Sequence, residues 1–103
     1  MVKIYMMYLN TEEGTLNMKY YKEKYMPMLK ELFSESLKQY NIDERISGRQ
    51  PNGLASYVAV GYLYFDTLLE YQEGFKKHGK KILSDIPNYT TTKTTVQISK
   101  VIK

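Results

Sequence analysis

The sequence contains no cysteine and only one histidine, His78. Without cysteine the chain cannot form disulfide bonds, use a thiolate nucleophile or build the common zinc sites. A single histidine leaves too few nitrogen ligands for a transition-metal site within one chain. We therefore expect no metal site within one chain.

Long apolar segments are also missing. No apolar run approaches the roughly 18 residues that span a bilayer. The N-terminal residues 1–9 lack the longer apolar region and the cleavage site of a signal peptide. We expect a soluble, cytoplasmic protein that does not bind membranes.

Arginine is scarce. The net charge of +4 comes almost entirely from lysine, because Arg45 and Arg49 are the only arginines. Proteins that bind nucleic acids usually gather arginine and lysine on one face, with aromatic residues between them. The strongest strand pattern, at residues 56–65, contains neither lysine nor arginine, which argues against an RNA-binding sheet. We expect no nucleic-acid partner.

The chain of 103 residues is long enough for one domain, which we expect to comprise residues 1–103. Apolar patterns predict strands at residues 2–9, 55–65 and 93–102, and a weaker strand near 42–46. A helical segment that begins after Asn17 is expected to start afresh or kink around Tyr25–Pro27, because proline cannot donate the backbone hydrogen bond, and to reach about Lys38. Turn-forming residues predict a loop at 47–53.

A second helix is expected to open at Thr67, which forms a capping-box pattern with Glu70. Its apolar stripe includes the histidine, at Leu68, Tyr71, Phe75, His78 and Ile82. This spacing of three and four residues places His78 on the inward face of the helix. The position is compatible with a core histidine, and equally with one that contacts a ligand or transfers a proton.

The order strand–helix–strand–strand–helix–strand predicts an α+β, ferredoxin-like sandwich. In this fold a four-stranded antiparallel sheet carries both helices on one face. The other face would expose a large apolar patch that includes Tyr5 and Met7. Pairing two such faces in a symmetric homodimer would cover the patch and enclose a cavity between the sheets.

Five segments together resemble the EthD family of dimeric α+β-barrel proteins. They extend over nearly the whole chain and comprise Leu16–Tyr21 with Met26–Met28, Tyr57–Asp66, Phe75 with His78, Asp85–Thr90, and Val96–Ser99. The resemblance implies the ferredoxin-like fold and a face-to-face homodimer. It also implies an association with ether degradation or with the tailoring of aromatic polyketides. Relatives with this barrel include cofactor-independent monooxygenases, lactone isomerases and haem-processing enzymes.

The sequence departs from the EthD pattern at Tyr25, because family members commonly carry histidine just before the Met-Pro pair. A tyrosine with an ordinary pKa near 10 is a poor base at neutral pH, but it can donate a hydrogen bond. Tyr25 and His78 are the candidate catalytic residues. The candidate ligand-binding residues lie on the strands, the first helix and the loop after the second helix, and they are Tyr5, Met7, Tyr21, Tyr62, Tyr64, Asn88 and Tyr89.

Two functions remain open from the sequence. One is a cofactor-independent enzyme, such as an oxygenase, an isomerase or a polyketide-tailoring enzyme, that acts on a small hydrophobic or aromatic molecule in the barrel cavity. The other is a binding or carrier module that uses the same cavity without chemistry. The missing histidine before Met26 favours the second function.

Overall fold

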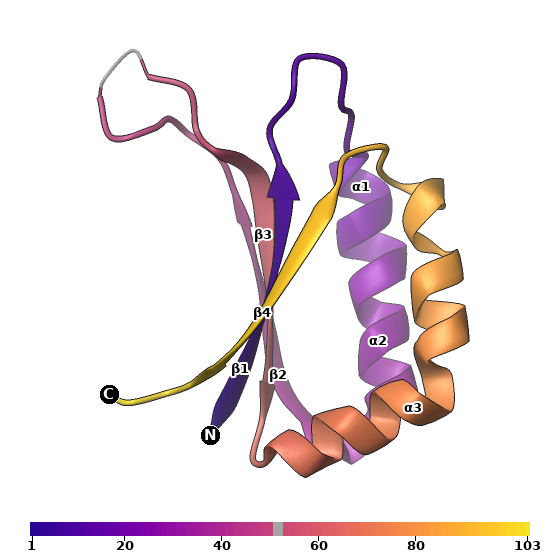
Figure 1. Cartoon of the computed structure of the whole chain (residues 1–103). Coiled ribbons are helices and arrows are strands. Elements are labelled where there is room, and N and C mark those ends of the chain that lie inside the picture. Colours follow the sequence, from indigo (N-terminus) through magenta and orange to yellow (C-terminus); the bar gives the residue numbers. More distant parts are fainter. Residues whose placement is uncertain (51–52) are drawn as a thin grey trace.

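The computed structural model describes residues 1–50 and 53–103. Within them a four-stranded antiparallel sheet carries the helices on one face (Figure 1). Its strands are β1 (Val2–Leu9), β2 (Leu37–Glu44), β3 (Tyr57–Phe65) and β4 (Thr94–Lys100), in the spatial order β2-β3-β1-β4. The helices are α1 (Met18–Tyr20), α2 (Met26–Phe33) and α3 (Leu68–Ser84). The predicted ferredoxin-like fold is confirmed.

The central strand β1 separates two environments. Ile4, Met6 and Tyr8 are buried beneath the helices, whereas Tyr5 and Met7 point to the opposite face. Strand β3 alternates in the same phase, so its buried residues meet those of β1 in the core between sheet and helices. The period-two alternation of the sequence thus determines which face the helices cover.

The first helical segment is interrupted where the sequence predicts it. The Asn17 side chain caps α1 by accepting a hydrogen bond from the backbone N–H of Tyr20, at 3.1 Å. A π-helical turn, η1 (Tyr21–Tyr25), follows α1, and α2 then begins at Met26. Pro27 lies in the first turn of α2, directly after the π-helical turn, and its missing N–H cannot donate back to a carbonyl of that turn.

The expected continuation of this helix to Lys38 is wrong. Helix α2 ends at Phe33, and Ser34 adopts a positive φ of 56° that turns the chain back toward the sheet. A 3₁₀ turn, η2 (Ser34–Ser36), leads directly into β2, which begins at the buried Leu37. The strand predicted near 42–46 therefore starts earlier and ends at Glu44.

Helix α3 begins with the predicted capping box. The backbone N–H of Glu70 donates to Thr67 Oγ1 at 3.3 Å, and the Thr67 N–H donates to Glu70 Oε1 at 3.2 Å. The helix bends to run beside α2 (Figure 1). At Gly74 a Cβ would overlap with the Phe33 ring, so this glycine allows α2 and α3 to pack closely.

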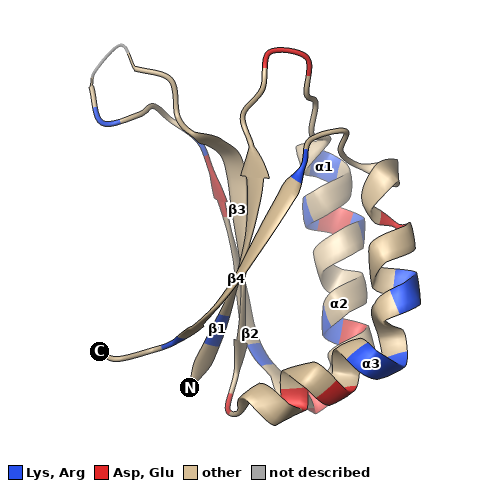
Figure 2. Ribbon diagram, in the orientation of Figure 1, with Lys and Arg blue, Asp and Glu red and all other residues tan. Residues whose placement is uncertain are grey.

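On α3 the acidic side chains lie near the start of the helix and the lysines follow them (Figure 2). Within the described residues, no helix is both long and apolar enough to cross a membrane. The same part of the chain holds no group of three or more His, Cys, Asp or Glu side chains placed to bind a metal ion. Residues 51–52 of the loop predicted at 47–53 lie outside the described residues.

Candidate functional site between the sheet and the helices

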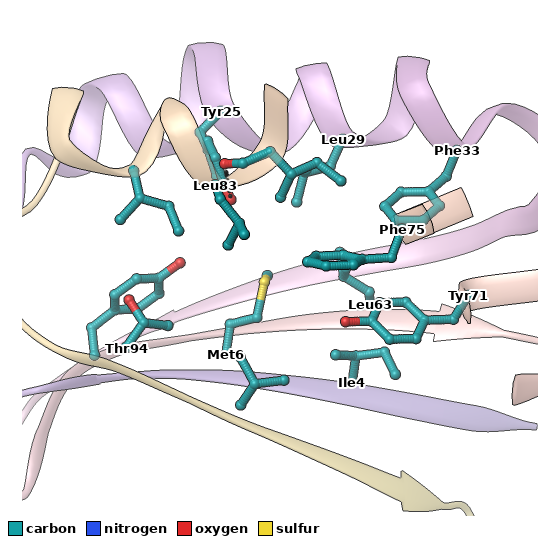
Figure 3. A pocket seen from close by; sticks show the side chains of 14 residues that line it. Ile4, Met6, Tyr25, Leu29, Phe33, Leu63, Tyr71, Phe75, Leu83 and Thr94 are labelled. Atoms are coloured by element: carbon teal, nitrogen blue, oxygen red, sulfur yellow. Dashed lines mark hydrogen bonds between the residues drawn. The ribbon is translucent and has the colours of Figure 1, made fainter. Parts of the chain in front are cut away.

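A cavity of about 220 Å³ lies between the sheet and the helices (Figure 3). Strands β1, β3 and β4 form its floor, and α2 and α3 form its roof. Its walls are mainly apolar and aromatic, and they include Leu29, Phe33 and Phe75. No side chain that lines it within the described chain carries a charge. The cavity therefore suits a small apolar molecule.

The exposed fractions of the lining residues locate the mouth of the cavity. Leu83 on α3 and Val96 on β4 are 54% and 52% exposed, whereas Ile4 and Leu29 in the interior are each 1% exposed. Helix α3 and the edge strand β4 therefore border the entrance.

Four hydroxyl groups belong to residues that line the apolar cavity: those of Tyr8, Tyr25, Tyr71 and Thr94. Tyr25 Oη donates to the backbone carbonyl of Ile82 at 3.2 Å. Thr94 Oγ1 is buried and has no hydrogen-bond partner among the described residues. Tyr25 and Thr94 lie toward one end of the cavity, and Tyr71 lies toward the opposite end beside Phe33 (Figure 3). These groups can form hydrogen bonds without contributing charge.

A cluster of tyrosine rings supports the end of the cavity that holds Tyr25. The Tyr8 and Tyr89 hydroxyls are 2.8 Å apart, and the ring centroids of Tyr25 and Tyr89 are 4.5 Å apart. Tyr21 packs against Tyr8, Tyr25 and Tyr89. The packing of these rings fixes the orientation of the Tyr25 phenol.

Burial keeps the phenols of the site protonated. It raises the pKa of Tyr25 to about 12. Burial also raises the pKa values of Tyr8, Tyr89 and Tyr71 above the ordinary value. At neutral pH these groups therefore act as neutral hydrogen-bonding groups and not as phenolate bases.

No protein-family model and no curated protein matches the sequence. A solved structure does: an EthD-like protein from Ralstonia eutropha JMP134 is 28% identical, with a TM-score of 0.95 over 99% of this chain and 92% of that chain. The resemblance to EthD-like proteins is confirmed.

An EthD family protein from Bacillus halodurans C-125 is 16% identical, with a TM-score of 0.69 over 99% of both chains. A proposed monooxygenase from Shewanella loihica PV-4 is 9% identical, with a TM-score of 0.63 over 99% of this chain and 94% of that chain. The likeness to these last two proteins shows the fold alone.

The structure separates the two candidate catalytic residues. Tyr25 lines the cavity, at the position before Met26 where the EthD pattern commonly has histidine. His78 is half-buried and lines a groove that also includes Ser34 and Glu73, and it does not line the cavity. The structure therefore does not bring Tyr25 and His78 into one site.

The loop candidates lie around the tyrosine cluster. Tyr21 and Tyr89 are buried and pack against Tyr25 without lining the cavity. Asn88 is exposed, and its side-chain amide donates to Asp85 Oδ1 at 2.8 Å, which stabilises the turn before β4. The Tyr21 and Tyr89 rings therefore support Tyr25 from outside the cavity, and Asn88 stabilises the neighbouring turn.

The strand candidates Tyr5, Met7, Tyr62 and Tyr64 lie on the face of the sheet opposite the helices. The Tyr5 and Tyr62 rings pack edge to face with centroids 5.3 Å apart. Lys3 Nζ lies 4.4 Å from the centroid of the Tyr62 ring, and it also lies over the rings of Tyr5 and Tyr64. This face and the cavity are separated by the sheet, so the residues expected from the sequence do not form one site within the chain.

Three hydroxyl-bearing residues that line the cavity are not among the candidates from the sequence: Tyr8, Tyr71 and Thr94. Tyr8 shares the inward phase of β1 with Ile4, and Tyr71 lies on the apolar stripe of α3. Thr94 shares its phase on β4 with Val96, and the sheet register pairs it with Tyr8. These phases were readable from the sequence, but the existence of a cavity on the helix side was not.

Proposed function

We propose that this EthD-like protein binds a small hydrophobic or aromatic molecule in the cavity between the sheet and the helices. The observation that carries this proposal is an uncharged, mainly apolar cavity of about 220 Å³ into which a few hydroxyl-bearing side chains are built. Ligand pockets usually combine apolar walls with a few polar groups that orient the ligand. From the sequence we expected the ligand to lie between the paired sheets of a dimer. The cavity supports a site on the other face of the sheet, beneath the helices.

Catalysis without a cofactor is the first form of this function, as an oxygenase, an isomerase or a polyketide-tailoring enzyme. Tyr25 would serve as a neutral donor that stabilises negative charge developing on a substrate oxygen, after exchanging its hydrogen bond to Ile82. Its raised pKa, about 12, favours this role over that of a general base. The fold shared with a proposed monooxygenase is compatible with this form.

A binding or carrier module is the second form. No charged acid–base pair lines the cavity within residues 1–50 and 53–103, and His78 lies outside it. A site that only encloses its ligand needs no such pair. This composition of the cavity favours binding without chemistry.

Incubation with 1-naphthol and dissolved oxygen distinguishes the two forms. The protein is titrated by NMR to locate the binding site, and the small molecules are then extracted and analysed by mass spectrometry. An oxidised product above the protein-free control supports catalysis, and Tyr25→Phe is then expected to lower the rate roughly 10- to 100-fold. Recovery of unchanged 1-naphthol after binding at the cavity supports the carrier form.

The matched control for Tyr25→Phe is Tyr40→Phe, because Tyr40 lies on β2 and does not line the cavity. Thermal unfolding of both variants separates loss of activity from loss of fold. If small aromatic molecules perturb none of the resonances of cavity residues, the proposed site is wrong.

A further inference from the structure

Thr94 places an unpaired hydroxyl in the cavity. It is the first residue of β4, and its register partner Tyr8 directs its side chain to the helix face of the sheet. Its Oγ1 is buried, and no described residue accepts from it or donates to it. A buried hydroxyl normally has a partner, because desolvation without a hydrogen bond is unfavourable. The orphaned hydroxyl therefore points to a partner that is not part of the chain.

Neighbouring hydroxyls already have partners within the protein. Tyr8 bonds to Tyr89 at 2.8 Å, and Tyr25 donates to the carbonyl of Ile82 at 3.2 Å. A ligand oxygen that enters this end of the cavity can bond to Thr94 without breaking either of those bonds. Thr94 thus differs from Tyr8 and Tyr25 in being ready to bind a ligand without rearrangement.

The cavity offers no compensation for a charged ligand. Lysine, arginine, aspartate, glutamate and histidine are all absent from its lining within the described part of the chain. A carboxylate or phosphate would lose its hydration there without gaining an ion pair. The size of the cavity suits one substituted aromatic ring, since a dry apolar cavity of about 150 Å³ is known to accept benzene.

We propose that the cavity selects neutral ligands that carry an oxygen atom, such as a phenol or a ketone, and that Thr94 forms the hydrogen bond that selects them. The ligand oxygen lies at the end of the cavity near Thr94 and Tyr25, and the apolar body of the ligand lies toward Phe33 and Phe75 (Figure 3). This inference rests on the proposed binding function and adds the ligand class and the residue that determines specificity.

Three matched probes test it: toluene, p-cresol and 4-methylbenzoate. All three contain one methyl-substituted benzene ring. Toluene carries no oxygen, p-cresol carries a neutral hydroxyl, and 4-methylbenzoate carries a carboxylate. Dissociation constants are measured by NMR titration of the full chain. In the unchanged protein, 4-methylbenzoate is expected to bind at least about tenfold more weakly than p-cresol, because its charge is unpaired in the cavity.

Substitutions at residue 94 isolate the hydrogen bond. Thr94→Val keeps the shape but removes the hydroxyl, and it is expected to reduce the preference for p-cresol over toluene by roughly tenfold, the value of one hydrogen bond. Thr94→Ser keeps a hydroxyl and should retain the preference. Thr95→Val is the matched control, because Thr95 is exposed and pairs with Met7 on the opposite face of the sheet.

The outcomes separate this inference from the proposed function. If toluene and p-cresol bind at the cavity and Thr94→Val leaves their ratio unchanged, the role of Thr94 is overturned while the binding site stands. Equal binding of 4-methylbenzoate and p-cresol overturns the selection of neutral ligands. If no probe binds to the folded protein, the proposed function fails and this inference fails with it.

Discussion

Gly61 leaves space in β3 for the hydroxyl of Tyr21. A Cβ at residue 61 would overlap with that hydroxyl and would come within 3.0 Å of Met6 Cε. The Tyr21 hydroxyl is itself buried and has no hydrogen-bond partner in residues 1–50 and 53–103. Its burial, which also raises the pKa of Tyr21 well above the ordinary value, therefore costs free energy that no hydrogen bond offsets.

This arrangement predicts an unusual pair of substitutions. Gly61→Ala is expected to lower the free energy of unfolding by about 1–3 kcal/mol, because the added methyl group overpacks the core. Tyr21→Phe alone should leave stability unchanged or raise it, since it removes an unpaired hydroxyl. The double variant should recover most of the loss. Urea unfolding checks all three, and a double variant no more stable than Gly61→Ala alone would contradict the steric explanation.

Individual site residues were only partly predictable from the sequence. Tyr25 was identified because it precedes Met26-Pro27, a local pattern that a sequence displays directly. Thr94 was not, because its shared phase with Val96 on β4 does not show that a cavity lies beside it. The periodicity of α3 placed His78 on the apolar stripe of the helix. Such a stripe is wide, and His78 lies at its edge, where it faces the groove beside α2 and not the cavity.

At the scale of elements, the entrance between α3 and β4 predicts the effect of a bulky residue at the mouth. Leu83→Trp should weaken toluene binding by narrowing the entrance, and should change the free energy of unfolding by no more than about 0.5 kcal/mol because the site is exposed. The chain contains no tryptophan, so the new residue is also a unique fluorescent reporter. Its emission should shift when toluene binds.

Leu69→Trp provides the matched control for the mouth. Leu69 lies on the same helix and is 61% exposed, but it does not line the cavity. This variant should bind toluene as the unchanged protein does, with constant tryptophan emission. Equal affinity of the two variants would place the entrance elsewhere.

The order and pairing of the elements followed from the sequence more completely than their boundaries did. Alternating residues in β1 and β3 and the capping pair Thr67 and Glu70 are local signals that the structure keeps. The end of α2 is different, because Leu37 follows Phe33 at the four-residue spacing of a helix, and only the backbone turn at Ser34 separates helix from strand. Leu37 would be buried whether it belonged to a helix or to a strand, so hydrophobic spacing alone could not locate the end of α2.

At the scale of the whole molecule, the sheet has two faces with different roles. One encloses the cavity with the helices, and the other presents Tyr5, Met7, Tyr62 and Tyr64 with no covering layer among the described residues. An extended aromatic and aliphatic surface of this kind usually marks an interface. A second copy of the chain, placed with its own sheet against this one, would bury both surfaces by the same contacts.

We therefore expect the protein to form a homodimer through the open face of the sheet. Light scattering should give about twice the chain mass of 12.1 kDa. Met7→Glu should shift the protein toward the monomer, because it places a charge in the centre of the proposed interface. Leu69→Glu, on the exposed surface of α3, should leave the dimer intact. Toluene binding to monomeric Met7→Glu should persist, since the cavity is built within one chain. The proposed interface would be ruled out if the unchanged protein were a monomer, or if Met7→Glu left a dimer intact.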